Sequence, residues 1–331
     1  MPFKKRLASI IIILIVFCSP VVLAKVVKKI TPLRSGNVEF SFVKDGEEVA
    51  QQLIDTISGE VIKTKGIIPD GPVHEYNRDG GLKYTWLYMK GMLEGITKEY
   101  DTRGRLAYKW NFSAGKLEEK SRELYPDGTI KAEMQFKHGV LEGPSREFYE
   151  SGQLQRESQY RSNMLHGPVK EYSLHGQLTA YSNYEEGKKH GVSEEYYSNG
   201  AVRKKVHYQR GERQGIAEEY FESGKMKVSS HYVHDVLDGA VKEYYESGVL
   251  RGKWNYKNGK REGLFERFYE NGNLMEELTF ENNKTEGIAN EYYENGMFKS
   301  IRVYKMGKLA SISTFDKEGA VLDENRFLTS E

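Results

Sequence analysis

The chain has 331 residues, of which 33 are glycine, 23 are tyrosine and only one is cysteine. Lys and Arg together number 49 against 48 Asp and Glu, so the formal net charge is +1. A phosphate-binding domain normally carries a clustered basic excess, so this balance argues against a nucleic-acid partner. A single cysteine supports neither a disulfide framework nor a thiolate metal site.

Residues 1–24 have the order of a secretory signal. A basic start (Lys4, Lys5, Arg6) precedes an apolar run that ends near Ala24. This order predicts a cleavable signal peptide and export to the bacterial periplasm or the cell exterior. The run approaches the length of a membrane span, so an uncleaved anchor is the alternative. Cys18 lies in the same segment, which leaves lipidation as a further alternative.

Residues 25–70 do not keep the spacing of the chain that follows. Residues 37–43 alternate like a strand, and Lys44, Asp45 and Gly46 follow them as a turn. An open repeat array leaves its edge strand unpaired, so we expect residues 25–70 to form an amino-terminal β cap.

From residue 71 to residue 310 the chain repeats every 24 residues for ten units. The first turn glycine recurs, with Glu119 as the one departure, at Gly71, Gly95, Gly143, Gly167, Gly191, Gly215, Gly239, Gly263 and Gly287. The second is invariant, at Gly80, Gly104, Gly128, Gly152, Gly176, Gly200, Gly224, Gly248, Gly272 and Gly296. A third position holds only Gly, Asn or Asp, the residues that tolerate a positive φ. We therefore expect the third position to be held for its backbone conformation and not for a side chain.

Each unit predicts two strands joined by tight turns, since Asn-Gly pairs flank short alternating segments. The predicted fold is all-β: an elongated antiparallel β-meander of about ten hairpin repeats in a single-layer open sheet. Residues 311–331 are expected to form a degenerate closing repeat, because Ser311 and Ala320 replace the two glycines.

Two-residue turns would place each first glycine opposite a large ring on the neighbouring strand. This ring row is Tyr88, Phe112, Phe136, Tyr160, Tyr184, Tyr208, Tyr232, Tyr256, Phe280 and Tyr304. The opposite face is expected to collect solvated side chains such as Lys131, Arg203, Lys227, Arg251 and Lys299. A second ring series, including Tyr196 and Tyr220, falls on that polar face. Either both faces carry rings or one turn length differs from two.

The units share the pattern Tyr-x-x-Gly-x-x-x-Gly followed by Glu-Tyr-Tyr-x-x-Gly-x-Leu. This pattern resembles the MORN repeat in its variant bacterial form, over roughly residues 67–310. Bacterial chains built this way are similar to the YwqK-type antitoxin family, which implies binding and neutralising a toxin protein. The resemblance also implies a platform for protein partners or a membrane-proximal module, without catalysis.

No P-loop, dinucleotide-binding glycine motif, His-Glu-x-x-His helix or Gly-x-Ser-x-Gly elbow occurs, so we expect no enzyme and no cofactor. His166 and His190 occupy equivalent places, as do His207 and His231, but two strands separate them by about 9.6 Å. We therefore expect no metal site.

Two rows are the candidate binding features. A glutamate row comprises Glu75, Glu99, Glu123, Glu147, Glu171, Glu195, Glu219, Glu243 and Glu291. One interpretation is an acidic stripe that binds a basic partner. The interpretation that we favour is that each carboxylate bonds to the backbone or to a cross-strand Lys, Arg or Tyr of its own hairpin. Trp86, Trp110 and Trp254 share one repeat position that elsewhere holds Met, Ser or Val. They are candidate ligand-facing residues, with end packing as an equal alternative.

The sequence therefore predicts an exported, non-enzymatic repeat scaffold that binds another protein in the cell envelope, in an antitoxin-like or immunity-like role. The alternative is a module that binds envelope glycan or lipid through its aromatic rows.

Overall fold

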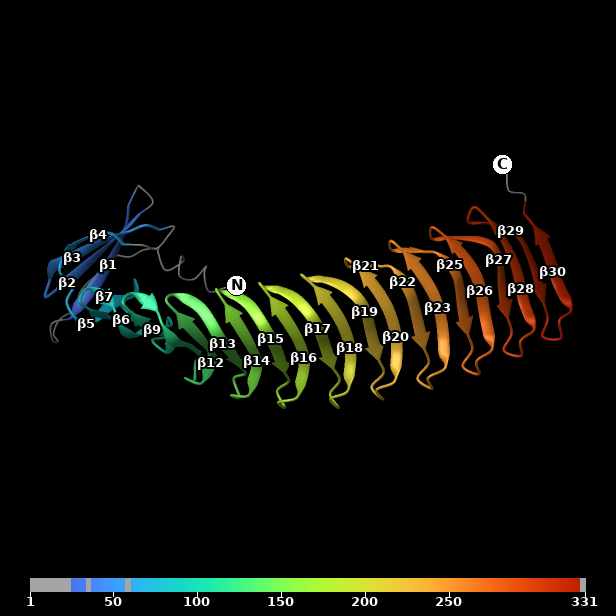
Figure 1. The fold of residues 1–331 in the computed structure, drawn as a ribbon. Helices are drawn as coiled ribbons and strands as arrows, with labels where there is room; N and C mark the ends of the chain where they lie inside the picture. The colour runs from blue at the N-terminus through green and yellow to red at the C-terminus, as the bar shows by residue number, and fades with distance from the viewer. Residues whose placement is uncertain (1–24, 34–36, 57–60, 328–331) are drawn as a thin grey trace. The chain divides into compact units, whose positions relative to one another are not determined.

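The computed structural model describes residues 25–33, 37–56 and 61–327. These residues form an all-β fold of thirty strands in one open sheet (Figure 1). Neighbouring strands are antiparallel and follow one another in chain order, except that β1 Val26–Pro32 pairs in parallel with β5 Gly71–Tyr76. The predicted all-β meander is confirmed. The described part of the chain contains no helix that could cross a membrane. The predicted signal segment, with Cys18, lies outside the described residues.

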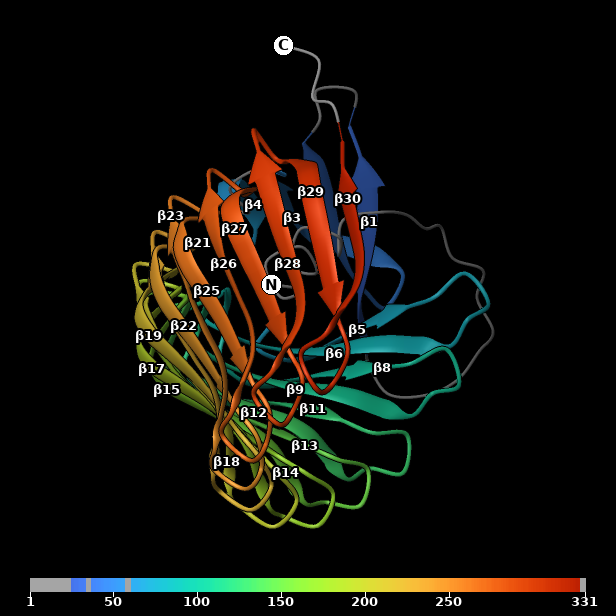
Figure 2. The same ribbon diagram turned by 90° about the vertical axis from the view of Figure 1, so that its right-hand side faces the viewer.

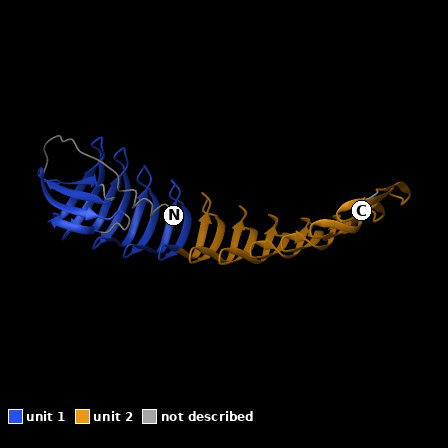
Figure 3. Cartoon of the chain, turned by 90° about the horizontal axis from the view of Figure 1, so that it is seen from above, with its two compact units in different colours: residues 1–164 blue, residues 165–331 orange. Residues whose placement is uncertain are grey.

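Two compact units divide the chain, residues 1–164 and residues 165–331 (Figure 3). The strands that begin in the first unit are β1 Val26–Pro32, β2 Val38–Lys44, β3 Glu47–Ile54, β4 Val61–Gly66, β5 Gly71–Tyr76, β6 Leu82–Met89, β7 Met92–Leu93, β8 Gly95–Tyr100, β9 Leu106–Ser113, β10 Lys116–Leu117, β11 Glu119–Leu124, β12 Ile130–Lys137, β13 Val140–Phe148, β14 Leu154–Arg161 and β15 Met164–Tyr172.

The remaining strands belong to the second unit. They are β16 Leu178–Glu185, β17 Lys188–Tyr196, β18 Val202–Gln209, β19 Glu212–Tyr220, β20 Met226–Val233, β21 Val236–Leu237, β22 Gly239–Tyr244, β23 Leu250–Lys257, β24 Lys260–Arg261, β25 Gly263–Phe268, β26 Leu274–Glu281, β27 Lys284–Tyr292, β28 Phe298–Lys305, β29 Lys308–Phe315 and β30 Val321–Arg326.

The turn at the third repeat position is a two-residue loop. Asn258 and Gly259 have φ values of 50° and 76°, and Lys257 pairs with Lys260 across them. Two consecutive positive φ angles are typical of the type I′ hairpin, whose twist matches that of the flanking strands. All ten third positions have a positive φ, as expected for positions held for backbone conformation.

The turn at the second glycine is one residue longer. The N–H of Gly248 donates to the carbonyl of Tyr245 at 2.9 Å, and the N–H of Tyr245 donates to Val249 at 2.9 Å. A three-residue loop that ends on a positive-φ glycine produces this arrangement. The pairing consequently shifts by one residue between Glu243 and Tyr244. The two-residue length expected at this turn is therefore wrong.

This shift is local, so the rest of each hairpin keeps the predicted register. Gly239 pairs with Tyr256, and the same ring-over-glycine pairing recurs in the other described hairpins. Each first glycine also has a positive φ, which is 117° at Gly239. At Glu119 a glutamate occupies that position with φ 53°, opposite Phe136. We call the sheet face that carries this row of rings the ring face.

Both faces of the sheet carry rings, and the second ring series, which includes Tyr196 and Tyr220, lies on the face opposite the ring face. Tyr196 donates its hydroxyl hydrogen to Glu194 at 2.6 Å, and Tyr220 does the same to Glu218 at 2.8 Å. Alternation in β17 places Glu194 and Tyr196 on the face opposite Ser193. Burial, together with the hydrogen bond to the neighbouring carboxylate, raises the pKa of Tyr196 and of Tyr220 to about 12.

Successive repeats are joined by side chains at both rows of turns. The hydroxyl groups of Tyr197 and Tyr245 each donate to a carbonyl of the next repeat, Tyr220 and Phe268, at 2.8 Å. At the other row, the carboxylate of Asp238 accepts from the N–H of Asn258 at 3.0 Å. These bonds satisfy turn groups and hold neighbouring hairpins in register.

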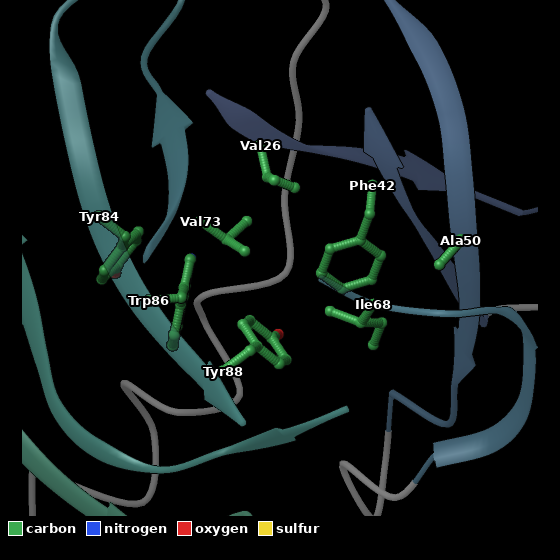
Figure 4. Close-up of a cluster of buried hydrophobic side chains, with 8 residues drawn as sticks. All are labelled: Val26, Phe42, Ala50, Ile68, Val73, Tyr84, Trp86 and Tyr88. Carbon is green, nitrogen blue, oxygen red and sulfur yellow. The ribbon is translucent and has the colours of Figure 1, made fainter. Parts of the chain in front are cut away.

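The described residues of the cap, within residues 25–70, cover the ring face of the first repeat. Val26, Phe42 and Ile68 pack against Trp86 and Tyr88 of β6 in a buried cluster (Figure 4). The edge of Tyr88 meets Phe42 at 5.4 Å between ring centroids. A second buried cluster comprises Tyr108, Trp110, Leu117, Ala132, Met134 and Phe136. The ring face of the first repeats is therefore occupied by the chain itself.

A lysine is buried in this cap. Lys28 is 6% exposed, and its Nζ lies 3.6 Å from the ring centroid of Phe40 and 4.4 Å from that of Trp86. Burial lowers the pKa of Lys28 to about 8, while Glu75 raises that pKa and Lys83 lowers it. The rings and Glu75 therefore compensate only part of the cost of burying this ammonium group.

The left-handed backbone at Glu119 predicts a stabilising substitution. Glu119→Gly should raise the free energy of unfolding in urea by about 1 kcal/mol, because glycine adopts this φ without the clash of a Cβ atom. Gly215→Glu is the reverse control, since its φ is 88° and a Cβ there would meet no atom within 4 Å. We expect this control to be less stable by a similar amount. A lower stability of Glu119→Gly would contradict the assigned turn.

Lys28 predicts a pH dependence of stability. Its folded pKa lies below the unfolded value, so the unfolded chain binds more protons between pH 8 and about 10.5, and stability rises with pH there. Relative to Lys28→Met, which keeps the packed stem, the wild-type protein should gain about 2 kcal/mol between about pH 7.5 and 9.5. Urea unfolding at each pH gives the free energy of unfolding of both proteins. If the two curves against pH run parallel, the pKa of Lys28 is not lowered.

Candidate functional site

A groove of about 590 Å³ lies on the ring face of the second unit, over β15 to β19. Small side chains form its floor, and long charged or aromatic side chains form its two walls. The lining residues are Val169, Glu171, Thr179, Ala180, Ser182, Tyr184, Lys189, Ser193, Glu194, Glu195, Arg203, Lys204, Val206, Tyr208 and Arg213.

The register of three adjacent strands builds the floor. Ser182 of β16 pairs with Ser193 of β17, which pairs in turn with Val206 of β18. The hydroxyl oxygen of Ser193 is buried and has no hydrogen-bond partner among the described residues. A buried polar atom without a partner is costly, so this hydroxyl is available to a ligand at the floor.

The size of one repeat position decides where the groove lies. Moving along the chain, that position holds Trp86, Trp110, Met134, Ser158, Ser182, Val206, Ser230, Trp254, Leu278 and Arg302. Where it is large, in the first repeats, its side chain is buried in the two clusters of the first unit. At Ser182 and Val206 it is small, and these two residues line the groove. The sequence prediction selected the tryptophans of this row, whereas the groove follows the small residues between them.

Rings and cations form one wall of the groove. Tyr184 and Tyr208 line it, and the Nζ of Lys189 lies 5.1 Å from the ring centroid of Tyr208. The guanidinium carbon of Arg213 lies 4.1 Å from the ring centroid of Tyr232. Stacking against a ring holds each cation at the wall, and Arg213 is held further by its Nε, which donates to the carboxylate of Asp235 at 2.9 Å.

The glutamate row forms the opposite wall, and its carboxylates are paired within their own hairpins. Glu195 binds Arg203, and the Nζ of Lys204 lies 3.1 Å from Glu219. The same cross-strand ion pairs form at Glu75, Glu123, Glu243 and Glu291, with Lys83, Lys131, Arg251 and Lys299 as the cations. The geometry thus favours the structural interpretation of this row over an acidic stripe.

Four of the basic residues expected on the polar face reach this row instead. Lys131, Arg203, Arg251 and Lys299 are exposed, as expected, but their cations contact the glutamates. The three-residue turn explains the difference. Its one-residue shift leaves Lys131 without a register partner between Ile130 and Ala132, so simple alternation does not apply there.

The three candidate tryptophans have different surroundings. Trp86 and Trp110 are 7% and 8% exposed, and their indole N–H groups donate to Glu75 at 3.1 Å and to Glu99 at 3.3 Å. Trp254 is half-buried, and its ring lies 5.4 Å from that of Phe265. None of the three is among the groove-lining residues.

The paired histidines are not brought into the groove. His207 pairs with Val192 and alternates with Val206 and Tyr208, so it lies on the face opposite the groove. His231 uses its Nδ1 atom in a 2.7 Å hydrogen bond with the carbonyl of Asp238. Among the described residues, no group of three or more His, Cys, Asp or Glu side chains is placed to hold a metal ion.

Five segments of the chain match the family model described as MORN repeat variant. They are residues 141–162, 189–210, 213–234, 237–258 and 261–282. The third and fourth strands of the groove, β17 and β18, contribute most of the segment 189–210. The repeat itself is thus shown by sequence comparison over these segments, in agreement with the resemblance drawn from the pattern.

No curated protein matches the chain. Among solved structures, the Tc holotoxin pore of Photorhabdus luminescens is similar over 88% of this chain, with 14% identity and a TM-score of 0.17. This chain spans 17% of the length of that protein. Such a low TM-score gives no basis for inferring fold or function from it.

The glutamate row predicts unequal effects of truncation. Glu75→Ala should lower the free energy of unfolding by about 3 kcal/mol, because it leaves the Trp86 N–H and the Lys28 ammonium without their buried carboxylate. Glu243→Ala removes only an exposed pair with Arg251 and should cost about 0.5 kcal/mol. Equal and small losses in urea unfolding of the two variants would contradict a structural role for Glu75.

Proposed function

We propose that this protein is a non-enzymatic repeat scaffold that binds another protein in the groove of its second unit. One observation carries the proposal. The chain covers the ring face of its first repeat with its own cap and fills the next repeats with large side chains, whereas in the second unit that face holds a groove with a floor of small residues. A concave surface with walls of rings and charges is suited to the anchoring side chains of a partner.

The chemistry of the walls supports a protein as the occupant. Tyrosine and arginine, which line this groove, are enriched at protein interfaces. Both signs of charge line the groove, so a partner with basic and acidic side chains meets complementary charges there. The matched repeats add support, because MORN repeats commonly serve as modules that bind proteins or membranes.

The cellular setting is part of the proposal. The order of residues 1–24 favours export, which would bring the groove to the periplasm or the cell exterior. An immunity-like role, in which the partner is a toxin arriving in the envelope, is the narrower form of this proposal. It rests on the resemblance of the repeat pattern to the YwqK-type antitoxin family.

Glycan binding is the second candidate, and the groove walls are the observation that favours it. Tyr184 and Tyr208 present rings beside carboxylates and hydroxyl groups, a combination that suits a sugar ring with apolar faces and polar edges. Such binding would need only a few adjacent repeats and would persist at high salt. A protein partner would bury a broader surface.

Filling the groove tests the proposal. Ser182→Trp introduces at the floor the residue that three other repeats already have at this position, so the fold should tolerate it. His207→Trp is the matched control, because His207 is exposed on the opposite face of a neighbouring strand. Each protein serves as bait in an affinity capture from cross-linked envelope extract.

We expect wild type and His207→Trp to capture the same dominant protein, and Ser182→Trp to lose it by about tenfold or more, which corresponds to roughly 1.4 kcal/mol. Equal capture by Ser182→Trp would place the contact elsewhere. Retention of polysaccharide alone, lost with Ser182→Trp and insensitive to salt, would replace the scaffold proposal with the glycan candidate.

A further inference from the structure

Among the described strands longer than two residues, β4 and β30 are paired on one side only. β4 pairs with β3, and β30 pairs with β29, with no second partner for either among the described residues. Figure 2 shows β30 lying outermost beside β29 in the second unit. All six residues of each strand are exposed. An edge strand of this kind presents a row of free N–H and C=O groups that can pair with another strand.

The two edge segments match each other in pattern. Residues 61–67 read Val-Ile-Lys-Thr-Lys-Gly-Ile, and residues 321–327 read Val-Leu-Asp-Glu-Asn-Arg-Phe. Parallel alignment from the first residue of each sets apolar side chains beside one another at the first, second and seventh positions. These six side chains, at 50–83% exposed, are Val61, Ile62, Ile67, Val321, Leu322 and Phe327. Exposed apolar side chains gathered on an edge indicate an interaction surface.

The charges of the two edges are complementary. The same alignment places Lys63 beside Asp323, while Lys65 on β4 and Glu324 on β30 add one further charge of each sign. None of the four has an ion-pair partner among the described residues. The one cation of β30, Arg326, falls beside Gly66, which carries no charge. Like charges facing each other across strands are destabilising, and opposite charges are favourable. Each edge therefore disfavours its own copy and favours the other edge.

A cavity beside the end of β4 offers room for the last apolar side chain. It has a volume of about 570 Å³ and is lined in part by Thr64, Ile67, Ile68 and Pro69. In the parallel alignment, Phe327 comes beside Ile67 at the rim of this cavity. Its ring, which is half exposed in the single chain, would be buried there.

We infer that β30 of one copy of this protein pairs with β4 of a second copy, in parallel and head to tail. The contact is heterologous, since the two copies contribute different strands, so each added copy presents a new free edge and the assembly grows with concentration. The pairing area of one strand is small, which makes each junction weak. This inference involves the sheet edges and is independent of the groove.

Charge reversal at each edge tests the inference. One variant carries Lys63→Glu with Lys65→Glu, and the other carries Asp323→Lys with Glu324→Lys. Protein purified from cells that express the full sequence is examined by sedimentation velocity over a range of concentrations. The wild-type weight-average mass should rise with concentration, and each variant alone should stay at the mass of a single chain.

Mixing the two variants in equal amounts should restore assembly, because each reversed edge meets an edge of opposite sign on the other variant. Lys116→Glu with Lys137→Glu is the matched control, since it makes the same charge change at exposed sites away from both edges. This control should assemble like wild type. A wild-type mass that does not change with concentration would overturn the inference, as would a mixture that fails to assemble.

Discussion

The structure depends on a positive φ angle at four places in every 24 residues, where the backbone must adopt a left-handed conformation. Three of these places hold Gly, Asn or Asp almost throughout, whereas the fourth, which precedes the third turn position, holds residues as different as Lys90, His138 and Met306. One of the three closes the two-residue loop, the second ends the three-residue loop, and the third lies under a ring of the adjacent strand. Because the turns fix the register, every repeat presents the same positions to the same face. The rest of the molecule is built on that constancy.

Because the register is fixed, the side chain at one repeat position can differ between repeats without changing the pairing of the others. The position of Trp86, Ser182 and Trp254 can change size without moving its neighbours, so the chain can fill the ring face in one region and leave it hollow in another. The glutamate row is constrained differently, because its carboxylates bind cations and indole N–H groups inside their own hairpins. The row that pairs within the hairpins and the row that sets the depth of the groove thus lie on the same face.

The meander and its ring-over-glycine pairing could be predicted from the sequence, because both follow from local turn chemistry and period-2 alternation. The three-residue turn could not, since Ser247-Gly248 fits either loop length and only the bond from Gly248 to Tyr245 distinguishes them. That one residue explains why Lys131 and Arg251 contact glutamates. The groove was missed for another reason. The sequence prediction rested on the tryptophans, whereas the groove lies at the small residues Ser182 and Val206 between them. The packing of the cap on the first repeat could not be predicted either, because the cap has no repeat pattern.

The central claim is that the ring face of the second unit contacts a partner protein, and a site-specific photo-crosslinker tests it most directly. A benzophenone amino acid would replace Thr179, which is exposed and lines the groove, or His207, which is exposed on the opposite face. After irradiation of living cells, we predict one discrete crosslinked protein from position 179 and none from position 207. The same crosslinked species from both positions, or from position 207 alone, would contradict the account.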